Sequence, residues 1–482
     1  MADKALKQKA IKGMFWSSCE RFGTLFILFI ANIVLARILS PEDFGLVGMV
    51  TVFVALSTIL IDGGLGSALI QRKNPTHEDY STIFIVNVAV ALGCYVILFA
   101  CSDFIAGFYR QPQLAVLLRV LGVALIIDSF SVIQNNILVK SLNFKRITKI
   151  KITVAVIAST AAIVSACSGL GVWSLVIQTL VNSTLRSILL WKFTTWHPSL
   201  IFRKDSFKSL FNFGSKLLLA SLISEGFRNL QFLIIGRFFP AKEVGYFSQA
   251  KQLENVPVSS LLMVVNQVTY PVFSQMQDSS EDLSNGLRRC FKLLAFVNFP
   301  VMILLAVVAE PLFLLLFSAK WLPAVPYFQW LCIGFGLLLV IHNTNLNALK
   351  AIGKSNVVLY LEIAKKALGV AFIFMLMRFG VIGILWALAL NSFIEFFLNA
   401  YFVGKYLSYG ICKQLKDLLP ILFLAATVGS IVYSIPYVLN THYLLLLCIQ
   451  SATFCLLYLS GAWMCKLEII NYIRKNLKNR IS

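Results

Sequence analysis

The chain has 482 residues, of which 59% are hydrophobic and only 13% are charged. A soluble domain carries about 25% charged residues, and here apolar runs of bilayer length recur from Phe15 to Leu459. The composition therefore excludes an ordinary soluble protein and predicts an all-α integral membrane protein. The net charge of +21 does not indicate nucleic-acid binding, because Lys and Arg fall in the gaps between apolar runs.

The apolar runs predict about fourteen transmembrane helices, each of roughly 20 residues. They lie near residues 14–37, 44–70, 81–102, 114–139, 150–169, 171–192, 213–238, 244–274, 291–317, 326–349, 356–378, 380–404, 417–437 and 442–465. The basic N-terminus leads into the first run, and no small-residue cleavage site follows it. We therefore expect a retained helix there rather than a signal peptide.

Lys and Arg are distributed unevenly between the two sets of connecting segments. With a cytoplasmic N-terminus, the cytoplasmic segments hold 29 of the 42 Lys and Arg residues, and the opposite loops with their flanks hold 7. Cytoplasmic loops of membrane proteins carry such an excess. We therefore predict that both termini lie in the cytoplasm, which requires an even number of spans.

A short sequence pattern occurs twice, 200 residues apart. Residues 37–45 read RILSPEDFG and residues 237–245 read RFFPAKEVG, so Arg37 and Gly45 recur as Arg237 and Gly245. Both copies end one predicted helix and open the next through a turn that contains Pro and an acidic residue. The repeat therefore relates predicted helices 1 and 2 to helices 7 and 8.

A second repeated pattern pairs Gly171-Val172 with Gly380-Val381, each followed by Asn-Ser eleven residues after the Gly. Six helices per repeat is an even number, so the two copies insert in the same orientation, as in transporters with parallel repeats. We predict two parallel six-helix bundles around a central cleft, with helices 13 and 14 added. The predicted domains are residues 1–200, 201–410 and 411–482, the last with a basic cytoplasmic tail.

Ionisable side chains inside membrane spans are costly and by default face an interior or a wet cavity. Six cations are candidates for binding an anionic substrate: Arg21, Arg186, Arg228, Lys251, Lys365 and Lys366. Seven carboxylates are candidates for ion coupling or for charge pairs: Glu20, Asp62, Asp128, Glu225, Glu254, Glu362 and Glu395.

Two interpretations of these charges stay open. Several stand one helical turn apart, where they can neutralise each other within one helix: Glu225 with Arg228, Lys251 with Glu254, and Glu362 with Lys366. Alternatively, the cations concentrated on predicted helices 7, 8 and 11 line a basic cavity for a phosphate or carboxylate, which Arg and Lys bind well away from water.

Three glycines follow Asp62 within four positions: Gly63, Gly64 and Gly66. Glycine weakens a helix by about 1 kcal/mol per residue. The segment therefore predicts either a hinge in a moving helix or close packing against a neighbouring helix.

Nothing in the chain predicts a cofactor, a metal site, a nucleophile or a nucleotide. Residues 348–355 (ALKAIGKS) resemble a relaxed phosphate-binding loop, but that loop follows a β-strand in an α/β domain. Here it is expected to be a turn between two membrane helices. The four His residues (His77, His197, His342 and His442) are scattered without metal-ligand spacing.

The string ARILSPEDFGLVGMV (residues 36–50), followed by LIDGGLGSALIQRK (residues 60–73), resembles the polysaccharide-flippase branch of the multidrug/oligosaccharidyl-lipid/polysaccharide (MOP) superfamily. More narrowly it is similar to the Wzx-type lipopolysaccharide and exopolysaccharide transporters, including colanic-acid and teichuronic-acid exporters. The resemblance implies two six-helix bundles in a V around a central cavity. It implies no enzymatic activity but the transfer of an undecaprenyl-pyrophosphate-linked oligosaccharide from the cytoplasmic to the periplasmic leaflet of a bacterial inner membrane.

The partners implied by this resemblance are the lipid-linked oligosaccharide, membrane lipids, and the polysaccharide polymerase with its chain-length machinery. Two other classes stay open. A multidrug antiporter of the MATE type requires an acidic cavity, whereas the candidates here are mixed to basic. A polytopic polymerase or glycosyltransferase requires a large loop outside the membrane, whereas the longest loop here, around residues 194–212, is short.

The loop of residues 140–151 tests the predicted topology. It carries five Lys and Arg residues, so a reporter fused there should register the cytoplasmic side of the membrane. A cysteine in the same loop should resist a membrane-impermeant thiol reagent in intact cells and react after lysis. A periplasmic position for this loop would overturn the topology.

Overall fold

A computed structural model of the chain describes residues 2–276, 279–439 and 441–468. All regular secondary structure in these ranges is helical. The chain forms two compact units, residues 1–245 and 246–482, and the boundary falls within helix α10. The domain boundaries expected near residues 200 and 410 rest on the internal repeat and stay a prediction.

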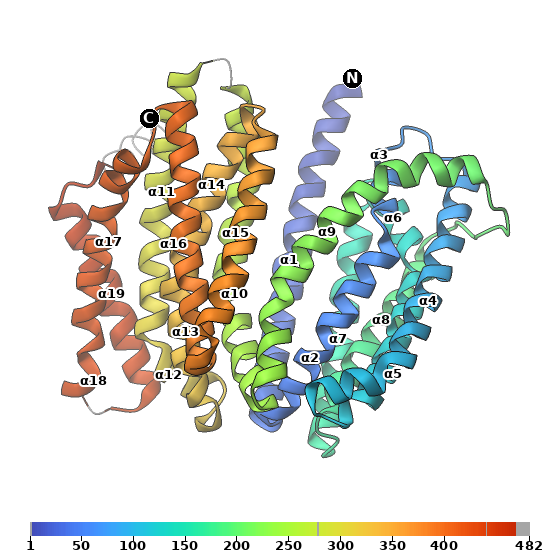
Figure 1. The fold of residues 1–482 in the computed structure, drawn as a ribbon, viewed down its shortest axis with the longest axis horizontal. Helices are drawn as coiled ribbons and strands as arrows, with labels where there is room; N and C mark the ends of the chain where they lie inside the picture. The colour runs from blue at the N-terminus through green and yellow to red at the C-terminus, as the bar shows by residue number, and fades with distance from the viewer. Residues whose placement is uncertain (1, 277–278, 440, 469–482) are drawn as a thin grey trace. The chain divides into compact units, whose positions relative to one another are not determined.

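The first unit holds the helices labelled α1 to α9 in Figure 1 and the first turn of α10. Their bounds are α1 (Ala2–Ile38), α2 (Pro41–Asp62), α3 (Leu65–Gln71), α4 (His77–Tyr109), α5 (Gln113–Ser129), α6 (Val132–Lys140), α7 (Phe144–Cys167), α8 (Trp173–Phe193) and α9 (Lys204–Phe238).

The second unit holds the rest of α10 and the helices that follow it, of which α11, α17 and α19 pack together (Figure 1). The bounds are α10 (Ala241–Gln275), α11 (Ser280–Val307), α12 (Ala309–Leu316), η1 (Ala319–Ala324), α13 (Val325–Trp330), η2 (Leu331–Gly336), α14 (Leu337–Ala351), α15 (Ser355–Leu376), η3 (Met377–Phe379), α16 (Gly380–Leu407), α17 (Ile411–Tyr433), α18 (Ile435–Val438) and α19 (Tyr443–Met464).

Ten helices of the described chain are long and apolar enough to cross a membrane, and eleven if the bent pair α5–α6 forms one span. This confirms a multi-pass, all-helical membrane protein, but it is fewer than the fourteen spans expected. One reason is that α15, η3 and α16 form a single apolar stretch of 52 residues, Asn356–Leu407, which counts once.

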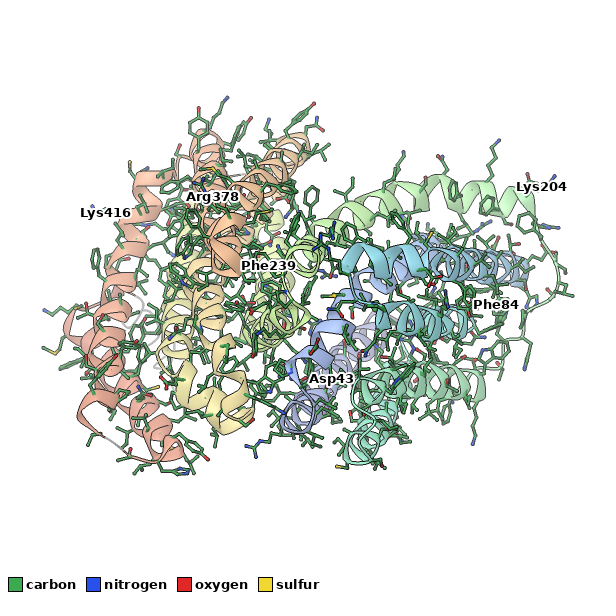
Figure 2. The ribbon with its side chains drawn as sticks, turned by 60° about the horizontal axis from the view of Figure 1, so that its bottom comes forward. Asp43, Phe84, Lys204, Phe239, Arg378 and Lys416 are labelled. Carbon is green, nitrogen blue, oxygen red and sulfur yellow. The ribbon has the colours of Figure 1, made fainter. Side chains whose placement is uncertain are left out.

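The helix starts follow directly from local sequence. Ser40 precedes α2, and its hydroxyl accepts a hydrogen bond from the Asp43 N–H while the Asp43 carboxylate accepts one from the Ser40 N–H at 2.9 Å. Thr76 and Asp79 form the same reciprocal cap at the start of α4. Each pair satisfies two backbone donors that a helix start leaves unpaired. Figure 2 labels Asp43 at the first turn of α2.

The repeat seen in the sequence corresponds to a repeat of helix ends. Helix α1 ends at Ile38 and α9 at Phe238, while α2 begins at Pro41 and α10 at Ala241. The offset is 200 residues in both cases. The same local sequence therefore produces the same helix–turn–helix corner twice.

The two repeated glycines lie against each other within the first unit. A Cβ on Gly45 would collide with the carbonyl of Ala241, and a Cβ on Gly245 would collide with the carbonyl of Pro41. The contact is reciprocal, so the first turns of α2 and α10 cross backbone against backbone. Only glycine allows such an approach, which explains why the repeated pattern ends in Gly in both copies.

The span that contains α2 and α3 is broken at two adjacent glycines. Gly63 and Gly64 have left-handed backbone angles, with φ of 56° and 66°, which glycine adopts without a steric penalty. A Cβ on Gly64 would collide with the backbone of Gly214 in α9, so the break is also a site of close packing. Gly66 lies inside α3. The break lies where the sequence places it, and hinge motion there stays a prediction.

A network of charged and polar side chains joins α17 to α11 in the second unit. The Asp417 carboxylate is buried and accepts hydrogen bonds from Arg288 Nε at 2.6 Å, Arg288 Nη2 at 2.8 Å and the Tyr409 hydroxyl at 3.0 Å. Lys292 Nζ adds an ion pair at 3.1 Å. Burial, and then the Asp417 charge, raise the pKa of the Tyr409 phenol. The bidentate pair sets the orientation of the first turns of α17.

Substitution at the glycine crossing should separate packing from helix propensity. We expect Gly45→Ala to lower stability by about 1–3 kcal/mol, because its Cβ has no room and the backbone must shift. Gly93→Ala is the matched control, since nothing lies within 4 Å of a Cβ there and Ala favours a helix by about 0.5–1 kcal/mol. Thermal unfolding of the purified proteins in detergent measures both. A Gly45→Ala protein as stable as Gly93→Ala would contradict the crossing.

Candidate functional site

The charged candidates of the first unit form ion pairs between helices in two places. Glu20 of α1 accepts a hydrogen bond from Lys151 Nζ of α7 at 2.8 Å. Asp128 of α5 and Arg186 of α8 form a pair at 2.8 Å. These two pairs join helices that are distant in sequence. Arg21, next to Glu20, is exposed.

A third pair of the first unit lies within α9. Arg228 Nη2 donates to the Glu225 carboxylate one turn earlier. The Asn229 amide also donates to Glu225 Oε1, at 2.8 Å. The Arg228 side chain is 74% exposed whereas that of Glu225 is 14% exposed. The carboxylate is therefore held in place, and most donors of the guanidinium remain available.

In the second unit, Lys251 and Glu254 of α10 form an ion pair at 3.0 Å, and the Glu254 side chain is only 1% exposed. The Lys251 ammonium also lies 4.0 Å from the centre of the Phe335 ring. An aromatic ring face attracts a cation more strongly where water is scarce. The lysine therefore has two partners, one from its own helix and one from η2.

Helix η2 is a π-helical turn between α13 and α14, and it presents Phe335 and Gly336 to this pair. A Cβ on Gly336 would lie 3.3 Å from Glu254 Oε1, so the carboxylate packs against the backbone. The Asn298 amide of α11 donates to the carbonyls of Gly336 at 3.1 Å and Leu337 at 2.8 Å. Side-chain donors of this kind satisfy carbonyls that a π-turn displaces from the regular helical pattern.

A second cluster of the same unit joins α14, α15 and α16. Lys365, whose side chain is 1% exposed, pairs with Glu362 of its own helix. His342 Nε2 of α14 lies 3.3 Å from Glu395 Oε2 of α16. The other oxygen of Glu395 accepts a hydrogen bond from the Asn391 amide at 2.9 Å. Two carboxylates, a buried ammonium and an imidazole thus occur within three packed helices.

Three of the candidate cations form an ion pair within their own helix. Arg228, Lys251 and Lys365 each pair with a carboxylate three residues away on the same helix. Because each of these cations is paired with a carboxylate, the three pairs together add no net positive charge to their helices. Glu362 pairs with Lys365 rather than with Lys366, the partner that the spacing suggested; Lys366 is half-buried. Substrate binding by these side chains stays a prediction.

Asp62 differs from the other candidate carboxylates. It is half-buried at the end of α2, and among the described residues no ion pair or hydrogen bond reaches its carboxylate. Its Oδ1 lies 2.5 Å from the position of a Cβ on Gly66. The side chain therefore folds back over the start of α3, across the helix break.

An apolar groove of about 550 Å³ lies between α11, α13, η2, α14 and α17 of the second unit. Its lining is mainly aliphatic and aromatic, including Ile303, Val307, Trp330, Leu337, Leu422 and Ala426. Polar side chains of Gln329, Ser430 and Tyr433 also line it. The groove has the chemistry of a site for a hydrocarbon chain.

Sequence reasoning missed three residues of these sites. His342 was set aside because it lacks metal-ligand spacing, although an ionisable residue inside a span was itself a signal. Phe335 and Asn298 carry no such signal, since their roles arise from the π-turn. Residues 348–355, which resemble a phosphate-binding loop, form the end of α14, a turn at Gly353 and the start of α15, as expected.

Similarity to known proteins extends over most of the chain. A family profile described as polysaccharide biosynthesis protein matches residues 34–326, more than half of the chain. The chain belongs to this family. The matched region runs from the end of α1 into α13 and so includes the repeated corners, the Asp62 segment and the Lys251–Glu254 pair.

Individual polysaccharide biosynthesis proteins are similar over most of their length. The chain is 26% identical to the teichuronic acid biosynthesis protein TuaB of Bacillus subtilis over 434 residues, or 89% of this chain and 90% of the relative. It is 29% identical to the lipopolysaccharide biosynthesis protein WzxC of Escherichia coli, covering 70% and 69%. It is 26% identical to the succinoglycan biosynthesis transport protein ExoT of Rhizobium meliloti, covering 72% and 70%.

Solved structures share the fold at low sequence identity. The lipid II flippase MurJ superposes with a TM-score of 0.77 at 14% identity, covering 95% of this chain and all of that one. A multidrug resistance transporter of the MATE family and MOP superfamily superposes with a TM-score of 0.60 at 16% identity, covering 86% and 99%. These two likenesses show that the chain shares the fold of MurJ and of this MATE transporter.

A double-mutant cycle tests the Lys251–Glu254 pair. Removing one partner of a buried pair leaves an uncompensated charge and costs about 3–5 kcal/mol. We therefore expect Lys251→Met to destabilise the protein strongly, and Lys251→Met combined with Glu254→Gln to recover much of the loss. Thermal unfolding of the two single variants and the double variant measures the coupling. Additive effects of the two substitutions would show that the pair contributes nothing.

Proposed function

We propose that this protein is a flippase that moves an undecaprenyl-pyrophosphate-linked oligosaccharide from the cytoplasmic to the periplasmic leaflet of a bacterial inner membrane. The transported unit supplies a surface polysaccharide such as an O-antigen, a capsule or an exopolysaccharide. The protein acts as a transporter, not as an enzyme. The observation that carries the proposal is the family match over residues 34–326.

The names of the related proteins support the same substrate class. ExoT is a succinoglycan biosynthesis transport protein, and TuaB and WzxC serve teichuronic acid and lipopolysaccharide biosynthesis. MurJ, which shares the fold, is a flippase for lipid II. A lipid-linked saccharide is the substrate class common to a lipid flippase fold and to polysaccharide biosynthesis.

The chemistry of such a substrate requires a polar path. Its hydrocarbon tail can stay in the bilayer, but desolvating the pyrophosphate in hydrocarbon would cost on the order of tens of kcal/mol. Arg228 lies near the middle of the span Gly214–Phe238. Its side chain is largely exposed, and its carboxylate partner Glu225 is shared with Asn229. The Arg228 guanidinium can therefore release the Glu225 carboxylate and bind a phosphate of the substrate, so it always has a negatively charged partner.

The apolar groove of the second unit suits the lipid part of the same molecule. Trp330, Leu337 and Leu422 form walls without charge. A polyprenyl chain held there would keep its polar head close to the protein. In this proposal, head and tail use different surfaces, one polar and one apolar.

The proposed architecture has fourteen spans, both termini cytoplasmic, and two six-helix bundles that alternate access to the two sides of the membrane. The fourteen segments expected from hydropathy all overlap helices of the structure, which supports this number. The 200-residue repeat of helix ends supports two related bundles. The polymerase and chain-length machinery are the proposed partners that consume the exported unit.

A MATE-like antiporter is the second candidate, because that family shares the fold with a TM-score of 0.60. Deletion of the gene distinguishes the two. We expect loss of the surface glycan and accumulation of the lipid-linked repeat unit on the cytoplasmic side of the membrane. Intact surface glycan with raised drug sensitivity would instead favour the antiporter.

Substitution of Arg228 tests the polar path. We expect Arg228→Ala to reduce glycan export at an unchanged protein level. Arg228→Lys should restore part of the activity, because it keeps the charge but loses the bidentate geometry. Complementation of the deletion strain, with surface glycan quantified against membrane protein level, measures this. Full export by Arg228→Ala would remove this residue from the path.

A further inference from the structure

Two broken helices meet inside the first unit. The break between α2 and α3 falls at Gly63 and Gly64, and α5 and α6 meet at an angle of 41°. Leu65 and Ile133, which follow the two breaks, pack in one hydrophobic cluster. Lys140 at the end of α6 donates to the carbonyls of Leu69 at 3.1 Å, Ile70 at 3.0 Å and Arg72, and so caps α3. The short helices α3 and α6 are therefore fixed together beside both breaks.

Asp62 and Asn136 converge on one point between these helices. A Cβ on Gly66 would lie 2.5 Å from Asp62 Oδ1 and 2.8 Å from Asn136 Nδ2. Asn136 is 8% exposed, and its Nδ2 has no hydrogen-bond partner in the described parts of the chain. Among the described residues, a half-buried carboxylate without an ion-pair partner and a buried amide nitrogen without a hydrogen-bond partner thus lie next to the same glycine.

Asn87 of α4 is a second buried amide without a hydrogen-bond partner among the described residues. It is fully buried, and neither polar atom of its side chain has a partner in the part of the chain that the structure describes. The ion pair of Arg72 with Asp79, at 3.1 Å, sets the register of α4 against the end of α3.

The face of α4 that carries Asn87 is the one that meets α3 and α6. Ile83, one turn before Asn87, packs in the same cluster as Leu65 and Ile133. Residues four apart on a helix share a face, so Asn87 points toward the same region as Asp62 and Asn136.

We infer that Asp62, Asn136 and Asn87 form a binding site for a monovalent metal cation at the α2–α3 break. The ligands would be the Asp62 carboxylate, the amide oxygens of Asn136 and Asn87, and carbonyls of the last turn of α2, which a helix end leaves free. The amide oxygens can face the cation because the O and N of an amide can exchange places. One carboxylate among neutral oxygens balances a single positive charge. Divalent cations take more carboxylates or keep more water.

This site is separate from the proposed substrate path and does not depend on which molecule is exported. A bound cation would hold the end of α2 against α4 and α6 beside the break, because its ligands come from these three helices. Cation binding is measured with the purified protein, whereas glycan export is measured in cells. The cation site and the flippase function can therefore fail independently.

The experiment measures thermal unfolding of the full-length protein in detergent against NaCl or KCl, with choline chloride keeping the ionic strength constant. We expect one of the two metal cations to raise the Tm in a saturable way, because a ligand of the folded state stabilises it. Asp62→Asn should abolish the rise, and Asn136→Ala should weaken it. Asp103→Asn is the matched control, since Asp103 is an exposed carboxylate paired with Arg119, and should keep the full rise.

Two glycine substitutions test the site without changing the Asp62 carboxylate. Gly66→Ala places a methyl group between Asp62 and Asn136 and should abolish the rise while both ligands remain. Gly93→Ala, where a Cβ meets nothing within 4 Å, should leave the rise intact. A rise that persists in Asp62→Asn, or no rise with either cation in the unmodified protein, would overturn the site. If the Tm depended on Asp62 only through pH, the carboxylate would bind a proton rather than a metal cation. That result would also overturn the proposed site.

Discussion

Hydrocarbon cannot solvate an ion, and this constraint governs where the charged side chains of the chain lie. Glu254 and Lys365 are almost fully buried, and each has a partner of opposite charge on its own helix. Burying either charge alone would cost several kcal/mol, whereas a paired and hydrogen-bonded charge recovers most of that cost. These two buried charges are therefore stabilised as pairs. An anionic substrate would bind by exchanging with a carboxylate.

The same constraint applies to the backbone wherever a helix is interrupted. Where η2 joins α14, the carbonyls of Gly336 and Leu337 accept hydrogen bonds from the Asn298 amide. At the end of α3 the free carbonyls are satisfied by Lys140. Irregular backbone at membrane depth persists only where the protein itself supplies such partners. The interruptions are thus marked by polar side chains from neighbouring helices, and both lie beside a candidate binding site.

Glycine supplies the other means of building this interior. The crossing of α2 and α10 at Gly45 and Gly245 brings backbone against backbone, and the break at Gly63 and Gly64 uses left-handed angles. In lipid there is little hydrophobic force between helices, so close van der Waals packing takes its place. The glycines that the sequence singles out therefore serve close packing or left-handed backbone angles, and only the tertiary structure shows which role each one has.

Much of the fold could be predicted from local sequence, because its causes are local. Hydropathy, helix caps such as Ser40 with Asp43, and the repeat of helix ends each depend on residues close together in the chain. The candidate site was predicted less completely. The spacing of Glu362 and Lys366 suggested a pair, yet Glu362 pairs with Lys365, because packing against neighbouring helices selects among side chains that one helix offers equally.

The sequence by itself determined that the chain is a multi-pass helical membrane protein, that its first corner recurs 200 residues later, and which family it resembles. Only the tertiary structure decided that His342 meets Glu395, that Lys251 faces Phe335, and that Asp62 has no counter-ion among the described residues. The physical reason is one of range. Hydropathy and capping act over a few residues, whereas the partner of a charge depends on how each helix is rotated and shifted against the others.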